Sequence, residues 1–263
     1  MTPKITIVTI CFNEELFIEK TLLSVINQTY SNKEYIVIDG GSIDQTTNIL
    51  QKYSNSFAYW ISERDNGIYD AWNKGISHAT GEYTIFLQGG DTFYNKNILE
   101  NVSPYLGNKN IDVLYGSHEY IDDMTKKTQI FEVRDINTLT KSLPFCPSAA
   151  FFKTSLIQKL KFNTNYRISG DYDMVARIYS MNYNFQFIQL PIIKFSPGGI
   201  STKVTLRLII EDYRAQRNIT NNFSLKINVV IRIYILFKEI IKTIIRNYSI
   251  GRILINIIRK FKI

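Results

Sequence analysis

The sequence predicts an α/β fold, in which a mostly parallel sheet is flanked by helices and followed by a basic amphipathic helical tail. Two observations predict it. Short apolar runs that suit buried strands alternate with segments of helical periodicity along the first half of the chain. The 263 residues are 45% hydrophobic and 21% charged, which suffices for one large α/β domain or one domain with an appendage.

Four strands and three helices are expected to alternate in the first third of the chain. The strands are expected at residues 5–10, 35–39, 57–62 and 83–87, and the helices at 14–27, 44–52 and 68–78. A cap signal from Ser42 and Asp44 opens the second helix. Ligands bind beyond the carboxyl ends of parallel strands, so Phe12, Asp39 and Asp91 are expected along one edge of a single site. Farther along the chain, the pattern predicts strands at 113–115 and 185–188 and helices at 172–180 and 204–220.

Residues 224–263 carry the charge of the chain. Between Lys226 and Lys262 there are nine Lys or Arg residues and one acid, Glu239, so this stretch alone accounts for the formal net charge of +8. Its charge-free runs are far shorter than the ~20 apolar residues that span a bilayer, and a helix lying in the membrane interface suits the pattern better. Packing on the body or an oligomer contact is the alternative. The nearly neutral body gives no support to a nucleic-acid surface.

The cysteines and histidines point away from metal-thiolate and disulfide chemistry. Cys11 and Cys146 form no CxxC pair, which favours a reduced, cytosolic setting. Cys146 has no obvious base nearby and is expected to be structural. The N-terminal run lacks the features of a signal peptide, so we expect a cytoplasmic protein, peripheral at the inner face of the cell membrane. His78 and His118 lack metal-ligand partners at useful spacing and are expected at the surface.

Three motifs that follow or adjoin expected strands are rich in oxygen-bearing side chains. Residues 39–44, Asp-Gly-Gly-Ser-Ile-Asp, offer close backbone approach to a ligand and a carboxylate for a base, or else a turn and a helix cap. Residues 62–75 place Asp70, Asn73 and Lys74 on one helix face, facing either a ligand or solvent. Residues 88–91, Gln-Gly-Gly-Asp, suit Mg²⁺ or Mn²⁺ held together with substrate phosphates, or form an ordinary turn.

With Thr9-Ile10-Cys11-Phe12-Asn13-Glu14-Glu15, these motifs resemble, in kind and order, those of the family 2 glycosyltransferases, especially small bacterial members of colanic acid, capsule and O-antigen gene clusters. The resemblance covers roughly residues 4–202. It implies a GT-A fold, Rossmann-like, of the nucleotide-diphospho-sugar transferases. Residues 1–110 are then the nucleotide-sugar-binding half, residues 111–223 the acceptor-binding half and residues 224–263 a membrane-associating tail. It also implies a nucleotide-diphosphate sugar donor (a UDP-sugar), a polyprenyl-diphosphate-linked saccharide acceptor, and Mg²⁺ or Mn²⁺.

The same resemblance implies a set of site residues. Phe12 is expected to stack on the base and Asp39 to hold it; Asp65 and Asp70 are expected to line the donor pocket, with Lys74 near phosphate. Further donor contacts are implied for Thr9, Asn13, Glu14, Gly41, Ser42, Asn73 and Gly90. Asp91 matches the last carboxylate of the family's DxD metal motif. Residues 167–173 resemble the segment that carries the catalytic base, which makes Asp171 the expected base, with Asp173 as backup and a helix cap as the alternative role.

Two positions depart from the family pattern. Gly89 stands where the first Asp of DxD is usual, so the cation must depend more on pyrophosphate and water. Pro147 and Ser148 stand where a His-Gln pair is usual, which puts acceptor or diphosphate contacts there in doubt.

The mechanism that these residues predict is an inverting displacement, in which Asp171 takes the proton of the acceptor hydroxyl. A nucleotidyltransferase of related fold is an alternative, although residues 11–15 lack the Gly, Arg and Lys of its N-terminal loop. A catalytically weakened membrane-bound scaffold is a second alternative, motivated by the two departures. The absence of GxGxxG and Walker-type loops excludes dehydrogenase and P-loop readings.

Overall fold

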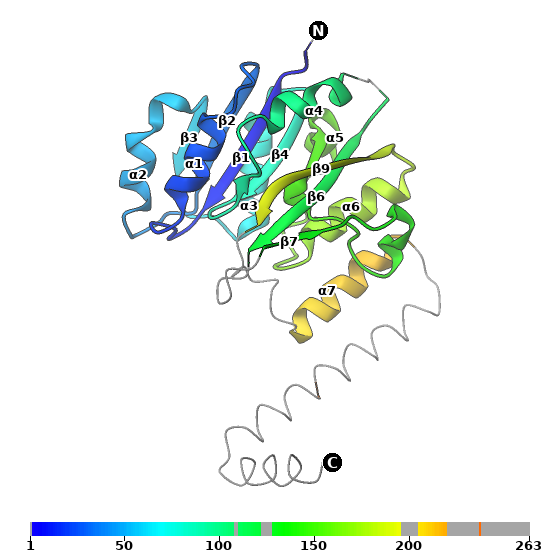
Figure 1. Cartoon of the computed structure of the whole chain (residues 1–263). Coiled ribbons are helices and arrows are strands. Elements are labelled where there is room, and N and C mark those ends of the chain that lie inside the picture. The colour runs from blue at the N-terminus through cyan, green and yellow to red at the C-terminus, as the bar shows by residue number, and fades with distance from the viewer. Residues whose placement is uncertain (1, 108–109, 122–127, 196–204, 220–236, 238–263) are drawn as a thin grey trace, which may run out of the picture.

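A computed structural model describes residues 2–107, 110–121, 128–195, 205–219 and 237 of the chain. In this part of the chain, nine strands form one sheet in the order β3-β2-β1-β4-β8-β6-β9-β5, and β7 pairs with β6 (Figure 1). The strands are β1 Ile5–Cys11, β2 Lys33–Asp39, β3 Tyr59–Ser62, β4 Tyr83–Gln88, β5 Thr92–Phe93, β6 Val113–Ile121, β7 Thr128–Phe131, β8 Ala150–Lys153 and β9 Phe185–Phe195. Strands β1 to β4, β6 and β9 run parallel, whereas β5, β7 and β8 run against them. The predicted mostly parallel sheet is confirmed.

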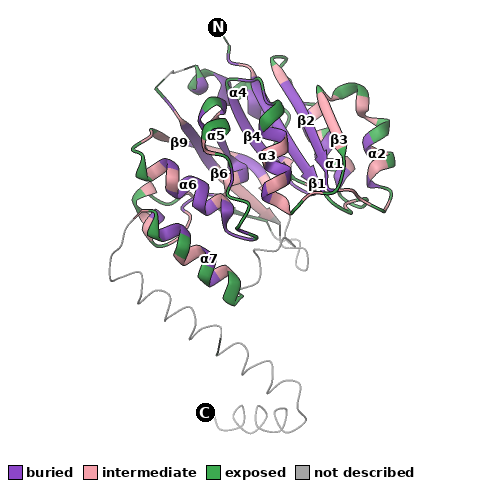
Figure 2. Cartoon of the chain, turned by 180° about the vertical axis from the view of Figure 1, so that it is seen from behind, coloured by how far each residue is buried: buried purple, intermediate pink, exposed green. Residues whose placement is uncertain are grey.

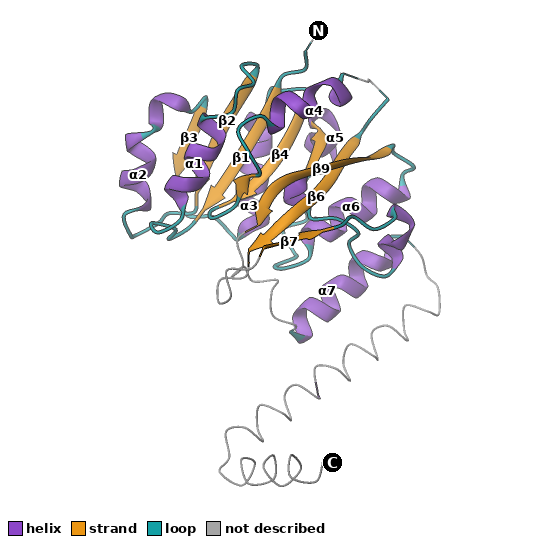
Figure 3. Cartoon of the chain, in the orientation of Figure 1, coloured by secondary structure: helices purple, strands orange, loops and turns teal. Residues whose placement is uncertain are grey.

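Helices cover both faces of the sheet, as Figure 3 shows. They are α1 Ile18–Ile26, α2 Thr46–Lys52, α3 Ile68–His78, α4 Ile98–Leu106, α5 Thr154–Leu160, α6 Gly170–Ser180 and α7 Leu206–Arg217. The apolar sides of α1, α2 and α4 pack on one face of the sheet, and those of α3, α5 and α6 on the other, so the central strands are buried on both sides (Figure 2). Helix α7 packs on α6.

The predicted elements exist, with shifted ends. The helix predicted at 14–27 begins at Ile18, because the N–H groups of Phe17 and Ile18 donate to the Glu14 carbonyl in a preceding turn. The strand predicted at 113–115 extends to Ile121, and the one at 185–188 extends to Phe195, because the two pair with each other along their length. Helix α3 has the predicted bounds.

Four substantial elements were not predicted: β7, β8, α4 and α5. Strand β8 matters most, because it inserts antiparallel between β4 and β6 and so joins the two halves of the sheet. In the described part of the chain, no helix combines the length and the apolar character needed to cross a membrane. The predicted tail at 224–263 falls, except for one residue, outside the described residues, as does the segment 196–204.

Candidate active site

A cleft of about 1590 Å³ opens at the carboxyl ends of β1, β2 and β4, between the first half of the sheet and α6. Loops from both halves of the chain line it. Six of the predicted site residues are among them: Phe12, Glu14, Gly41, Asp65, Asp91 and Asp171. The other eight do not line it: Thr9, Asn13, Asp39, Ser42, Asp70, Asn73, Lys74 and Gly90. The acidic side chains predicted to converge on one rim are therefore divided between the cleft surface and its support.

The loops after β1 and β2 are bonded to each other. The Asn13 N–H donates to the Ser42 hydroxyl over 2.8 Å, and the Asn13 amide oxygen accepts from the Ile43 N–H over 2.9 Å. The Glu14 N–H donates to the Thr46 hydroxyl over 2.8 Å. Asn13 has a φ of 54°, a left-handed conformation that asparagine tolerates better than most residues. These bonds fix the edge from which Phe12, 58% exposed, projects into the cleft.

Asp39 organises the loop after β2 from inside the protein. It is fully buried, and its carboxylate accepts hydrogen bonds from the N–H groups of Gly41 and Ser42 and from the hydroxyls of Ser42 and Ser62. These bonds hold the backbone of the loop in place. In this conformation Gly40 and Gly41, rather than the Asp39 side chain, face the cleft, so a direct contact between Asp39 and a base would require some of these bonds to break.

Asp65 enters the cleft beside Gly40. A Cβ at position 40 would lie 2.7 Å from the Asp65 Oδ2 atom, so only glycine leaves room for this carboxylate. The Asp65 Oδ1 atom accepts from the Gly67 N–H over 2.9 Å, which fixes the turn into α3.

The polar face predicted on α3 supports the cleft from behind. Asn73 exchanges two hydrogen bonds with the backbone of Phe162, which ties α3 to the loop after α5. The Lys74 ammonium pairs with Glu63 over 2.8 Å, and Asp70 accepts from the Asn66 N–H. For Lys74 to contact a phosphate, its ammonium group would have to leave Glu63.

Two further predicted residues belong to the walls. Thr9 is fully buried within β1, where its hydroxyl lies 3.1 Å from that of Tyr35. Gly90 has a φ of 98° and donates its N–H to the Thr21 hydroxyl, so it shapes the turn that carries Asp91. Thr9 and Gly90 therefore help to position β1 and the turn after β4, and neither lines the cleft.

Asp91 lines the cleft with 2% of its surface exposed. Carboxylate oxygen suits Mg²⁺ or Mn²⁺, which use one or two carboxylates together with substrate phosphates. Among the described residues, no group of three or more His, Cys, Asp or Glu side chains converges as a metal site. The donor set therefore fits a cation that a diphosphate helps to hold, and does not fit one that the protein binds by itself.

Glu14 extends toward the same strand end. A Cβ at position 89 would lie 2.8 Å from the Glu14 Cγ atom, so the Glu14 side chain occupies the space next to Gly89. Burial raises the pKa of the Glu14 carboxyl, and the nearby charge of Asp44 raises it further, against a smaller lowering by Lys20.

Asp171 stands in the first turn of α6, where Tyr69 of α3 packs against Gly170 so closely that a Cβ there would lie 2.7 Å from the ring. Burial is the main cause that raises the pKa of Asp171 to about 6, and the charge of Asp212 adds to it, although the N–H of Tyr172 donates to the carboxylate. A carboxyl with such a pKa can accept a proton near neutral pH.

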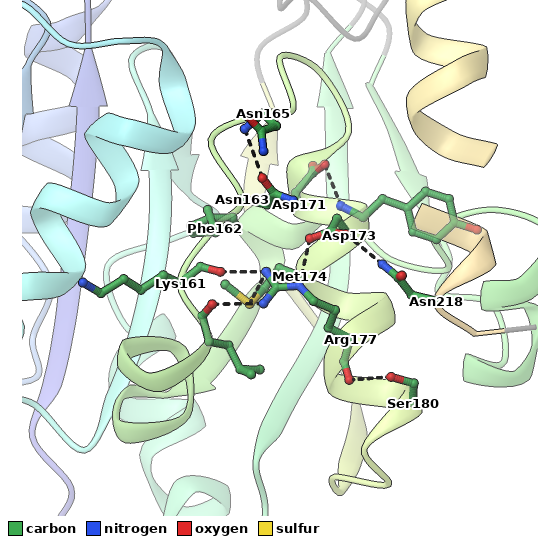
Figure 4. A network of polar contacts seen from close by, with 12 residues as sticks. Lys161, Phe162, Asn163, Asn165, Asp171, Asp173, Met174, Arg177, Ser180 and Asn218 are labelled. Carbon is green, nitrogen blue, oxygen red and sulfur yellow. Dashed lines mark hydrogen bonds and ion pairs between the residues drawn. The ribbon is translucent and has the colours of Figure 1, made fainter. Parts of the chain in front are cut away.

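Asp173, the backup candidate, does not line the cleft. Its carboxylate is 2% exposed and is bonded to the Arg177 guanidinium over 2.8 Å and to the Asn218 amide over 2.9 Å. Figure 4 shows Asp171 and Asp173 bonded to different partners, with Arg177 also reaching the carbonyl of Lys161. Asp173 therefore braces α6, and the geometry favours Asp171 as the base.

Asp91 and Asp171 are both close enough to Cys146 for their charges to act on it. Burial raises the pKa of the Cys146 thiol to about 12, and the charges of Asp91 and Asp171 both contribute. The thiol therefore stays protonated. Cys146, Pro147 and Ser148 all line the cleft, so the position of the missing His-Gln pair is part of the site.

Glu211, on α7, was missed by sequence reasoning. It is 3% exposed, and its carboxylate accepts from three successive backbone N–H groups, those of Arg167, Ile168 and Ser169, over 2.8 to 3.1 Å. It thereby holds the loop that leads directly into the turn of Asp171. The signal is invisible in sequence, because Glu211 is one acid in a polar helix 40 residues beyond Asp171.

An aromatic wall, defined here as His118, Phe131 and Phe195, was also missed. The three rings line the cleft, and those of His118 and Phe131 stack with centroids 5.3 Å apart and planes 7° from parallel. Burial lowers the pKa of His118, so this imidazole is neutral near pH 7. The prediction that His118 is a surface residue is wrong, because the unpredicted pairing of β6 with β7 sets it in the cleft wall. His78 is exposed, as predicted.

Comparison with known proteins places this cleft in context. The sequence model described as "Glycosyl transferase family 2" matches residues 6–176. An uncharacterized glycosyltransferase of Mycobacterium tuberculosis is 32% identical over 183 residues, which cover 66% of this chain and 68% of the relative.

Two solved structures share the fold, which is of the GT-A type. S. aureus TarS 1–349 in complex with UDP has a TM-score of 0.64 at 18% identity, covering 82% of this chain and 64% of TarS 1–349. The chain thus spans less than two thirds of that structure. The mannosyltransferase PcManGT from Pyrobaculum calidifontis, in complex with GDP-Man and Mn²⁺, has a TM-score of 0.61 at 16% identity, covering 97% of this chain and 83% of the neighbour.

Proposed function

Because the chain belongs to glycosyl transferase family 2 and is a glycosyltransferase, we propose that it is an inverting enzyme that moves a sugar from a nucleotide-diphosphate donor, a UDP-sugar in our proposal, to a hydroxyl of a lipid-linked saccharide. The observation that carries the proposal is that Asp91 and Asp171, from the two halves of the chain, line one cleft and both act on Cys146. One carboxylate suits the donor's cation and the other suits the acceptor's proton.

On the donor side, Phe12 offers a ring for the base, and Gly40 and Gly41 let the backbone approach the nucleotide beside Asp65. Asp91 would hold Mg²⁺ or Mn²⁺ together with the donor diphosphate. When bound, that cation would offset the charge on the departing nucleoside diphosphate. TarS with UDP and PcManGT with GDP-Man and Mn²⁺ support a nucleotide-sugar donor, and they do not favour one base over the other.

On the acceptor side, Asp171 accepts the proton of the attacking hydroxyl. The aromatic wall supports a saccharide as the acceptor, because neutral rings stack on the apolar faces of sugars. A polyprenyl diphosphate as the lipid, and residues 1–110 and 111–223 as the donor and acceptor halves, follow from the family resemblance and belong to the proposal.

The test is Asp171→Asn. With the donor identified by a thermal-shift screen of nucleotide sugars, we expect nucleotide affinity to be kept and transfer to fall about 10²- to 10⁴-fold, the worth of a general base. In the wild type, kcat/KM should rise with pH and level off above about pH 6, because Asp171 must be ionised to act as base. Unchanged turnover in the variant would reject Asp171. A weakened scaffold, the remaining alternative, predicts no turnover of any nucleotide sugar.

Asp171→Asn should also change the free energy of unfolding. Because the folded-state pKa of Asp171 is raised, its contribution to stability is fully present below the unfolded pKa near 3.8 and is lost as pH rises through about 6. Asp171→Asn should therefore be more stable than the wild type at pH 8, by up to about 3 kcal/mol, and this gain should shrink toward pH 4. Urea unfolding at the two pH values measures the difference.

We propose further that residues 224–263 bind an anionic membrane at its cytoplasmic face, where a lipid-linked acceptor is found. The support is the charge pattern of the sequence. Flotation with vesicles of anionic and of neutral lipid tests it. The full chain should float with the anionic vesicles, and Arg252→Glu/Arg259→Glu/Lys260→Glu should not; equal flotation of the two chains would contradict the proposal.

A further inference from the structure

Gly89 is not required by the backbone. Its φ lies outside the left-handed region, unlike that of its neighbour Gly90 at 98°, so the chain itself permits a side chain at position 89. What excludes one is Glu14. A Cβ at position 89 would lie 2.8 Å from Glu14 Cγ and 3.2 Å from both Glu14 Cβ and Glu14 Cδ. The side chain of Glu14, from the loop after β1, fills the place that a residue-89 side chain would take.

Among the described residues, the Glu14 carboxylate accepts no hydrogen bond and forms no ion pair, and the charge that attracts it is that of Lys20. Its backbone N–H and carbonyl are both bonded within the loops. It is partly buried and lines the cleft. Its oxygens are open to the cleft, and the bonds of its backbone fix the side chain's point of attachment. Such a group suits a positive ligand that enters the cleft.

We propose that Glu14 supplies the carboxylate that position 89 lacks, as a direct or water-mediated oxygen ligand, alongside Asp91, of the divalent cation that binds with the donor diphosphate. The inference rests on the proposed function, which provides the nucleotide diphosphate. Two carboxylates from different loops then replace two from one strand end. Mg²⁺ and Mn²⁺ are commonly held by one or two carboxylates together with phosphate, which is the number that this arrangement provides.

The experiment measures the fold-gain in nucleotide affinity that Mn²⁺ confers. UDP and GDP are titrated into the full chain by calorimetry with and without Mn²⁺, and bound Mn²⁺ is followed by its electron paramagnetic resonance signal. Glu14→Gln, which keeps the shape of the side chain, should reduce the gain by about 10- to 100-fold, the usual cost of losing a group that supports a metal site. Affinity without Mn²⁺ should stay unchanged.

A pair of variants tests the exchange of positions. Gly89→Asp alone should bind the nucleotide poorly in the presence of Mn²⁺, because the Cβ atom at position 89 meets the Glu14 side chain. Glu14→Ala/Gly89→Asp removes that obstacle and returns a carboxylate, so it should recover most of the Mn²⁺ gain that Glu14→Ala loses. Glu132→Gln removes one charge from another wall of the same cleft and serves as the matched control, with the gain retained.

Two results would overturn the inference. One is a full Mn²⁺ gain in Glu14→Gln. The other is an equal loss of affinity with and without Mn²⁺, which would place Glu14 on the nucleotide itself. Both leave the proposed function standing. A wild-type chain that binds neither UDP nor GDP would contradict the proposed function, and the inference with it.

Discussion

The two sides of the cleft are built by different means. On the donor side, residues of the loops after β1 and β2 bond to one another: Asn13 with Ser42 and Ile43, and Asp39 with its own loop. On the acceptor side, the turn that presents Asp171 is held by residues far away in sequence. Tyr69 precedes it by about a hundred residues, and Glu211 follows it on α7.

The difference concerns redundancy. Separate hydrogen bonds from Asn13 and Glu14 join the loop after β1 to the loop after β2, so the loss of one leaves the others in place. In the loop before Asp171, three successive N–H groups all depend on the Glu211 carboxylate. We therefore expect a large effect from substituting Glu211 and a small effect from substituting Asn13.

The largest effect is expected at Glu211. Glu211→Ala leaves three N–H groups of residues 167–169 without their acceptor, and each unsatisfied buried donor costs about 1–3 kcal/mol, so the total loss should reach several kcal/mol. Glu211→Gln keeps one carbonyl oxygen and should cost about 1–3 kcal/mol. If Glu211 positions the base, Glu211→Gln should also lower kcat and shift the pH at which kcat/KM levels off, with nucleotide affinity unchanged.

Arg207→Ala provides the control for that experiment. Its guanidinium pairs with Glu211 over 3.0 Å but is 59% exposed, and exposed pairs contribute only about 0–1 kcal/mol. Urea unfolding should thus separate Arg207→Ala from Glu211→Ala clearly. If both destabilise equally, the ion pair rather than the three N–H bonds holds the loop, and the contrast drawn here fails on the acceptor side.

The same difference explains what could be predicted from sequence. Donor-side motifs are compact, because residues such as Asp39, Gly41 and Ser42 contact one another within a few positions, and the alternating pattern of β1 to β4 was confirmed for the same reason. The roles of residues within the motifs were harder to predict from sequence. Asn73 and Lys74 share a helix face with Asp70 as expected, but in the structure Asn73 and Lys74 bond to Phe162 and Glu63 of the protein itself.

Acceptor-side features depend on pairing between distant segments, which carries no local pattern. Strand β8 has only four residues and exists because β4 and β6 accept it from both sides. His118 reaches the cleft because β6 runs on past its predicted end and pairs with β7. Asp171 was found through its motif, but its raised pKa follows from burial and from Asp212 on α7, and no spacing in the sequence indicates either.

The smallest effect is expected at Asn13, and it tests the donor side of the comparison. Asn13→Gly removes the hydrogen bond from the Ile43 N–H, which is worth about 0.5–1.5 kcal/mol. Glycine adopts the left-handed conformation of residue 13 without steric strain. Asn13→Ala removes the same bond and adds the cost of a left-handed non-glycine residue, about 1–2 kcal/mol. The difference in unfolding free energy between the two variants isolates the backbone term. Because the Asn13 N–H still reaches Ser42 and that of Glu14 still reaches Thr46, nucleotide affinity in Asn13→Gly should stay close to that of the wild type. A loss of unfolding free energy as large as that of Glu211→Ala would mean that the junction between these two loops depends on the Asn13 side-chain bond, and that it is no more redundant than the loop held by Glu211.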